Sequence, residues 1–301
     1  MGVLVVHGAG YEKDPALRYL KRQRLRAGLL AGFVAAERIR LTHALNETAE
    51  TLPFPVRMVE YSQALNTSET MEPELPAPTR LVEVFEWQPI PKARCMCCLQ
   101  RRSPYKANVR DWAGNVAKGQ SRAADVIERR FPDVHRYVTR GDGRTAAIAA
   151  VHEAISPDIR VVIGHSLGSV VVVDTLARVA EHAAPDLLVT IGSPLRYSAI
   201  RQRLDAATTN WIQRRLTPWL NVHDRSDVVT GGGSLPLRHF PGVINLGVDN
   251  LDHSHAGDYY LRHPIVGHLI WDVADGLLAP DQLRTGIPKD GVYGTRFKER
   301  D

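Results

Sequence analysis

Residues 161–174 read VVIGHSLGSVVVVD and place Ser166 between two glycines inside a run of valines. Before Gly164 the run is short, β-branched and continuous, which is typical of a strand buried on both faces. After Gly168 the apolar residues recur at helical spacing. We therefore predict that Ser166 lies at a tight turn from a strand into a helix. Glycines two residues away on either side leave room for such a turn.

The rest of the chain alternates apolar strand candidates with helical patterns. Strands are predicted in GVLVVHGAG, FPVRMVEYS, DLLVTIGSPL, TPWLNVHDRSDVV and GVINLGV, and helices over residues 16–50, 106–130, 142–155 and 262–278. Continuous apolar strands separated by helices favour the α/β class, with a mostly parallel sheet covered by helices on both faces. Ligands of such sheets bind at the carboxyl ends of the strands. We find no linker and predict a single domain over residues 1–301.

Composition and charge restrict the classes of protein further. The 301 residues are 44% hydrophobic and 24% charged, as in an ordinary globular protein. The chain passes from Met1 almost directly into an apolar strand, and the apolar stretch 27–36 is too short to span a bilayer, so we expect a cytoplasmic location. Residues 80–130 hold eleven Lys and Arg against five Asp and Glu, in a chain of net charge +5. This region is predicted to be a solvated basic surface or, alternatively, to contact a membrane surface or an anionic substrate. No nucleic-acid-binding pattern is present.

A serine hydroxyl becomes a nucleophile only with a base within hydrogen-bond reach and a third group that orients the base. The acid is expected after the serine and before the histidine. LNVHDRSDVV supplies two aspartates, Asp224 and Asp227, which we expect in the loop after a strand that ends at Val222. We prefer Asp227, because it stands further beyond the strand beside two valines that can anchor the loop. Asp224 is the alternative and is better placed to cap the turn; plain turn aspartates are the simpler interpretation of both.

DHSHAGDYYLRHP follows the strand candidate 243–248 and supplies three histidines. His263 lies at the start of a predicted helix, where we expect a structural role. His253 and His255 lie in the loop itself; we favour His255 as the base and keep His253 as the alternative. The two loop histidines lack a third ligand at a recognisable spacing, so no metal site is predicted.

The tetrahedral intermediate of acyl transfer carries an oxyanion that needs two N–H donors. We expect one donor to be the backbone N–H of Leu167, directly after the serine. The other is predicted in the glycine loop HGAG, as the N–H of Ala9 with Gly8 or Gly10 close by. His7 is expected to support this loop rather than to act as a base.

Taken in chain order, these features resemble the α/β-hydrolase superfamily. DVHRYV, IGHSLGSVV, TIGSPL, NVHDRSDVV and VDN are similar to a group of bacterial α/β-hydrolases of lipase or esterase type. The resemblance covers residues 1–10 and about 130–278, and it implies Ser166 as nucleophile, Asp227 as acid and His255 as base. The chain starts directly at the strand before the oxyanion loop. The early antiparallel strands of larger members are therefore expected to be missing, and the sheet to be smaller.

Residues 66–105 fall outside the resemblance and are predicted to be an irregular, proline-rich insertion. In many α/β-hydrolases an insertion forms a lid over the active site, so this segment is a candidate lid. It holds all three cysteines, Cys95, Cys97 and Cys98. Zinc usually takes four ligands, and acylation needs a second membrane signal, so free thiols are the simplest interpretation of C-x-C-C. No disulfide framework is predicted.

The sequence therefore predicts a serine hydrolase that cleaves a small-molecule or lipid ester through an acyl-enzyme and needs no cofactor. An acyltransferase or thioesterase would use the same triad, because both share the first half of the reaction. A non-catalytic α/β-hydrolase-like binding module is the third possibility, against which the complete candidate triad argues.

Overall fold

A parallel β-sheet organises the chain in the computed structural model, which describes residues 2–8, 15–40, 54–59, 61, 132–139, 141–274 and 292–293. The sheet has seven strands in the order β2-β1-β3-β4-β5-β6-β7. Their bounds are β1 Gly2–Val6, β2 Val56–Val59, β3 Ile159–His165, β4 Leu187–Ile191, β5 Trp219–Asp224, β6 Val243–Val248 and β7 Val292–Tyr293. Every pairing between these strands is parallel. The strand segments thus align their carboxyl ends along one edge of the sheet.

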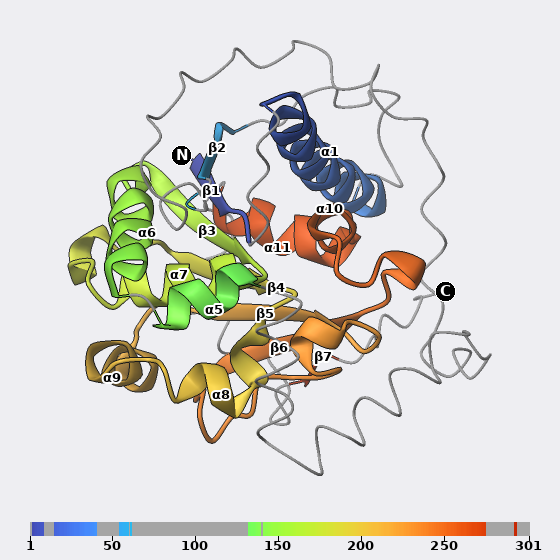
Figure 1. Cartoon of the computed structure of the whole chain (residues 1–301). Helices are drawn as coiled ribbons and strands as arrows, with labels where there is room; N and C mark the ends of the chain where they lie inside the picture. The colour runs from blue at the N-terminus through green and yellow to red at the C-terminus, as the bar shows by residue number, and fades with distance from the viewer. Residues whose placement is uncertain are drawn as a thin grey trace.

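Helices cover both faces of the sheet (Figure 1). Their bounds are α1 Pro15–Arg40, α5 Pro132–Thr139, α6 Gly141–Ala154, α7 Leu167–Leu176, α8 Ser198–Arg201, α9 Ala206–Arg214, α10 Gly257–Leu261 and α11 Pro264–Ala274. Short 3-10 turns complete the described elements: η2 Glu181–Ala183, η3 Pro194–Arg196, η4 Val228–Thr230 and η5 Leu251–His253. Helices α1, α10 and α11 pack together on one face, and α5, α6 and α7 lie on the other.

Alternation of side chains along each strand divides the core into two layers. In β1, Val3 and Val5 face the layer that contains α1 and α11, whereas Leu4 and Val6 face the layer that contains α6 and α7. All four side chains are fully buried. A strand covered on both faces favours apolar residues on both sides, which explains the unbroken apolar run of β1 in the sequence.

The predicted α/β class and the mostly parallel sheet with helices on both faces are confirmed. The helix predicted over 262–278 is α11, which begins at Pro264 and is described as far as Ala274. A separate short helix that was not predicted, α10, precedes it and ends at Leu261. Proline has no N–H to continue a preceding helix but is well suited to begin one. The structure describes the helix predicted over 16–50 as far as Arg40.

Several predictions lie outside the described residues. They concern the insertion 66–105 with its three cysteines, the helix over 106–130 and the basic region 80–130. The single domain and the lid therefore stay predictions. Within the described part of the chain, none of the helices has the length and apolar character needed to cross a membrane.

Candidate active site

Ser166 occupies the turn between β3 and α7 and has an unusual backbone conformation. Its φ is 54° and its ψ is −128°, a region that residues other than glycine rarely adopt. The turn is tight on both sides. A Cβ on Gly164 would lie 2.6 Å from the Cα of Ser169, and one on Gly168 would lie 2.3 Å from the carbonyl oxygen of Val6. The two glycines are therefore needed for close backbone approach, as the sequence predicts.

His255 lies between Ser166 and Asp227 and is within hydrogen-bond distance of both. Its Nε2 is 3.0 Å from Ser166 Oγ, and its Nδ1 is 2.9 Å from Asp227 Oδ2. An ionised carboxylate can only accept hydrogen bonds, so Nδ1 carries the ring proton and donates a hydrogen bond to Asp227. Nε2 is then free to accept the proton of the serine hydroxyl. The structure thus brings together the three side chains that the sequence selects.

Asp227 is held in place by groups other than His255. Its side chain caps η4, where Oδ1 accepts a hydrogen bond of 2.9 Å from the backbone N–H of Val229. Oδ2 accepts a second bond, of 2.7 Å, from the hydroxyl of Tyr260. The carboxylate is completely buried, so these donors replace the water that it loses on folding. Sequence reasoning missed Tyr260, because a tyrosine in YYL is equally typical of a core residue.

The alternative acid, Asp224, has a structural role. We expected Asp224 in the loop after the strand, but it is the last residue of β5. There it pairs with Val248 of β6. Its carboxylate accepts backbone N–H groups from Asn250 at 2.5 Å and from Ser226 at 2.6 Å. Burial raises the pKa of Asp224 to about 6, although these two hydrogen bonds oppose the shift. The side chain fastens the loop after β6 to the end of β5.

The other histidines that the sequence singles out, His253, His263 and His7, have contacts of their own. His253 stacks on Tyr259, with ring centroids 4.1 Å apart. His263 Nε2 lies 2.9 Å from the amide oxygen of Asn250, and burial lowers the pKa of His263 to about 4. His7 Nδ1 lies 3.1 Å from the carbonyl oxygen of Gly8. These contacts support the structural roles expected for His263 and His7.

The first turn of α7 offers the expected oxyanion donor. Leu167 is the first residue of that helix, where backbone N–H groups have no partner within the helix. Gly8 lies directly against this turn: a Cβ on Gly8 would be 2.5 Å from Ser166 Cβ and 3.1 Å from the nitrogen of Leu167. The loop after β1 thus approaches the serine closely. Ala9 and Gly10, where the second donor is predicted, lie outside the described residues.

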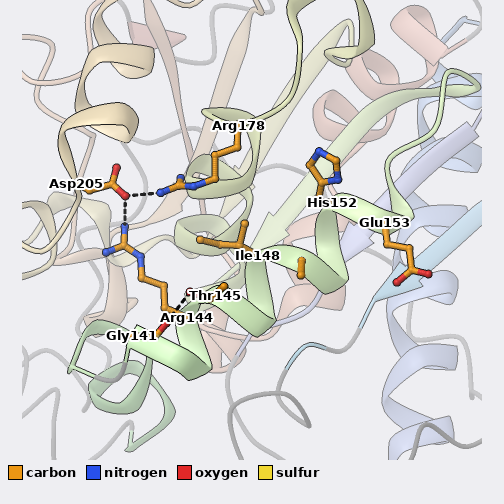
Figure 2. A pocket seen from close by; sticks show the side chains of 9 residues that line it. Gly141, Arg144, Thr145, Ile148, His152, Glu153, Arg178 and Asp205 are labelled. Atoms are coloured by element: carbon orange, nitrogen blue, oxygen red, sulfur yellow. Dashed lines mark hydrogen bonds and ion pairs between the residues drawn. The ribbon is translucent and has the colours of Figure 1, made fainter.

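A hollow of about 550 Å³ lies elsewhere, along α6, and does not include the three side chains (Figure 2). Arg144 and Arg178 line it, and both form ion pairs with Asp205. Arg144 also binds the buried Asp174 at 2.9 Å. These guanidinium groups are therefore already paired with carboxylates, and we assign them to the packing of α6, α7 and α9. Among the described residues, no three His, Cys, Asp or Glu side chains gather as metal ligands would.

Comparison with known proteins adds little to this geometry. No protein-family model matches the chain, and no curated protein is significantly similar to it. A solved structure described as the esterase domain of a Rhodothermus marinus protein is 19% identical over 44% of this chain and 69% of that chain, with a TM-score of 0.32. A likeness of this size carries no conclusion about activity. The α/β assignment rests on the sheet and helices of this chain itself.

Proposed function

We propose that the protein is a serine hydrolase that cleaves a carboxylic ester through an acyl-enzyme, with Ser166, His255 and Asp227 as its triad. The observation that carries the proposal is the continuous chain of contacts from Ser166 Oγ through the His255 ring to Asp227, at 3.0 and 2.9 Å. The strained conformation of Ser166 adds support, since strain of this kind is concentrated at functional sites.

The chemistry follows from the positions of the protons. As Ser166 Oγ attacks the ester carbonyl, His255 Nε2 takes the hydroxyl proton, and Asp227 stabilises the resulting imidazolium. The N–H of Leu167, together with that of Ala9, would stabilise the oxyanion. When the intermediate collapses, the C–O bond to the alcohol breaks and His255 returns the proton to the leaving alkoxide. Water then enters, His255 removes one of its protons, and the oxygen of the water adds to the acyl carbon. The C–O bond to Ser166 breaks, the carboxylic acid leaves, and His255 returns the proton to Ser166 Oγ.

We further propose that the substrate is a small-molecule or lipid ester. The basic region 80–130 would favour anionic or interfacial substrates through its excess of Lys and Arg. Acyl transfer to another acceptor, or thioester cleavage, would use the same first half-reaction and is the alternative. A purely binding role is disfavoured because it gives no reason to bury Asp227 completely beneath a histidine that is aligned on a serine.

Labelling by a fluorophosphonate probe tests the proposal. The wild-type protein should be labelled at one site, and digestion followed by mass spectrometry should locate the label on Ser166. Ser166→Ala should lose labelling and at least about 10³-fold in ester turnover, as triad nucleophiles do. Ser198→Ala, at the start of α8, is the matched control and should be labelled like the wild type. A wild-type protein that neither reacts with the probe nor turns over short-chain aryl esters would overturn the proposal.

A further inference from the structure

His165, the last residue of β3, is joined to the main chain of His255. Its Nε2 lies 3.0 Å from the carbonyl oxygen of His255, across 90 residues of sequence. A carbonyl oxygen can only accept a hydrogen bond, so Nε2 must carry the ring proton and donate it. The contact therefore selects one tautomer of His165.

The surroundings of the other ring nitrogen of His165 favour a neutral imidazole. Nδ1 is buried and has no hydrogen-bond partner among the described residues. A Cβ on Gly257 would lie only 3.3 Å from this nitrogen, so the ring is closely covered on that side. Burial lowers the pKa of His165 well below 6.5, and the nearby rings of His255 and His7 lower it further. A buried nitrogen without a partner lowers stability, so the hydrogen bond made by Nε2 has to be explained by something other than a gain in stability from the whole ring.

His165 also contacts the ring of His255. The centroids of the two imidazoles are 5.0 Å apart and the planes are inclined by 35°. The ring of His7 is also close, with its centroid 5.2 Å from that of His165. One side chain therefore contacts His255 twice, through its main-chain carbonyl and through its ring.

His255 itself belongs to neither a strand nor a helix, so its position depends on contacts with other elements. It lies in the short connection between η5 and α10, whereas His165 belongs to a buried strand of the sheet. A general base must stay within hydrogen-bond reach of the proton that it removes, and a displacement of about 1 Å can lower a rate about 10²-fold. The hydrogen bond from His165 fixes the loop that contains His255 beside Ser166, the residue that directly follows β3.

We propose that His165 is a positioning residue: its Nε2–H holds the main chain of His255 so that the imidazole of His255 stays between Ser166 and Asp227. Its neutral state matters as well. A positive charge at His165 would oppose the imidazolium that forms on His255 during proton transfer. The catalytic part of this inference rests on the proposed hydrolase function, whereas the hydrogen bond itself does not.

Two variants of similar volume isolate the hydrogen bond. Both His165→Leu and His165→Gln remove the ring, but only the glutamine can present an N–H near the place of Nε2. We expect His165→Leu to lower the rate of fluorophosphonate labelling and the kcat for a small aryl ester by about 10- to 100-fold, with little change in KM. His165→Gln should stay within a few-fold of the wild type. Thermal unfolding of both variants shows whether the effect follows loss of the fold.

Nitrogen-15 NMR of histidine-labelled wild-type protein at neutral pH supplies a readout that needs neither activity nor a variant. It should show His165 as the neutral Nε2–H tautomer, and a downfield Nδ1–H signal of His255 from its bond to Asp227. A His165 that is cationic or protonated at Nδ1 would overturn the inference, whether or not the protein is a hydrolase. Equal labelling rates in the leucine variant and the wild type would overturn it too and leave the proposed function standing. If the wild type is not labelled but His165 has the expected tautomer, the hydrolase proposal is wrong. The hydrogen bond from His165 to the main chain of His255 is then still supported.

Discussion

Tyr260 donates a hydrogen bond of 2.7 Å to Asp227 Oδ2, the same carboxylate oxygen that lies 2.9 Å from His255 Nδ1. The Tyr260 hydroxyl also accepts a bond of 3.0 Å from the backbone N–H of Asp224. It thereby connects α10 to the end of β5. Since α10 begins two residues after His255, the tyrosine fixes both Asp227 and the helix that follows His255.

Removing this hydroxyl should weaken both the fold and the triad. Tyr260→Phe deletes a donor to a buried carboxylate and leaves the N–H of Asp224 without its partner. We expect the free energy of unfolding to fall by about 1–3 kcal/mol and kcat to fall by about 10-fold. Urea unfolding and hydrolysis of a short-chain ester measure the two effects. Tyr259→Phe, which removes a hydroxyl from the adjacent position of α10, is the control and should change neither. A Tyr260→Phe enzyme with unchanged kcat would show that the hydroxyl serves the fold alone.

Paired substitutions test the choice between the two aspartates. Asp227→Asn preserves the shape of the side chain but removes the charge that orients His255, so we expect kcat to fall about 10³- to 10⁴-fold with the fold retained. Asp224→Asn affects a carboxylate that binds the backbone of Asn250 and Ser226, so it should lower stability rather than kcat. Steady-state kinetics at a temperature where both variants are folded separates these outcomes. A folded Asp224→Asn protein that is as inactive as Asp227→Asn would reverse the assignment of the acid.

The same comparison applies to the two loop histidines. His255→Gln should lose fluorophosphonate labelling, because the amide cannot act as a base. His253→Gln loses only a ring that stacks on Tyr259 and should be labelled at close to the wild-type rate. Labelling that survives in His255→Gln but disappears in His253→Gln would exchange their roles.

The parts of the structure that depend on local pattern are the parts that sequence reasoning predicts well. Strand β6 has the bounds expected from its largely apolar run, Val243–Val248, because a strand covered on both faces favours apolar residues. Strand β5 runs two residues further than expected, to Asp224. Its pairing with β6 continues through two polar residues, which the apolar pattern cannot indicate.

In the candidate site, too, local sequence patterns predict some residues, and contacts between distant segments determine the others. Ser166 follows from its glycine-flanked turn, and the acid and base follow from their places after later strands. The geometry then separates Asp227 from Asp224 and His255 from His253, which the sequence alone left open. Tyr260 and His165 depend on contacts between segments 33 and 90 residues apart, and neither has a local signature. The residues of the proposed triad are marked by motif, whereas the residues that hold them in place are found only in the folded chain.

Gly8 gives a sharp test of the loop beside Ser166. A methyl group there would lie 2.5 Å from both Ser166 Cβ and the carbonyl oxygen of His165. Gly8→Ala must therefore push the loop after β1 away from the serine, and we expect ester turnover to fall by about 10²-fold. Gly141→Ala is the matched control, since nothing lies within 4 Å of its added methyl group. Kinetics of the two variants should differ by this factor, and a fully active Gly8→Ala protein would contradict the close approach.

Burial of His263 predicts how stability depends on pH. Its pKa is lowered to about 4 in the folded protein, by burial first and then by Arg262, against an ordinary value of 6.5. Between these values the unfolded chain binds a proton that the folded protein does not, so stability falls as pH falls from about 6.5 to 4. Burial also lowers the pKa of His223 to about 4, which acts in the same direction. The raised pKa of Asp224 acts in the opposite direction over about pH 4–6, because there the folded state binds the proton.

Replacing His263 isolates its share of this dependence. A glutamine at this position can still donate to the amide oxygen of Asn250 but cannot be protonated. Urea unfolding at a series of pH values should therefore show a slope smaller by up to about 1.4 kcal/mol per pH unit in His263→Gln than in the wild type between pH 4 and 6.5. His182→Gln, at an exposed position of η2, is the control and should leave the slope unchanged. Identical slopes in His263→Gln and the wild type would mean that His263 is protonated as readily in the folded protein as in the unfolded chain, which would contradict the lowered pKa of His263.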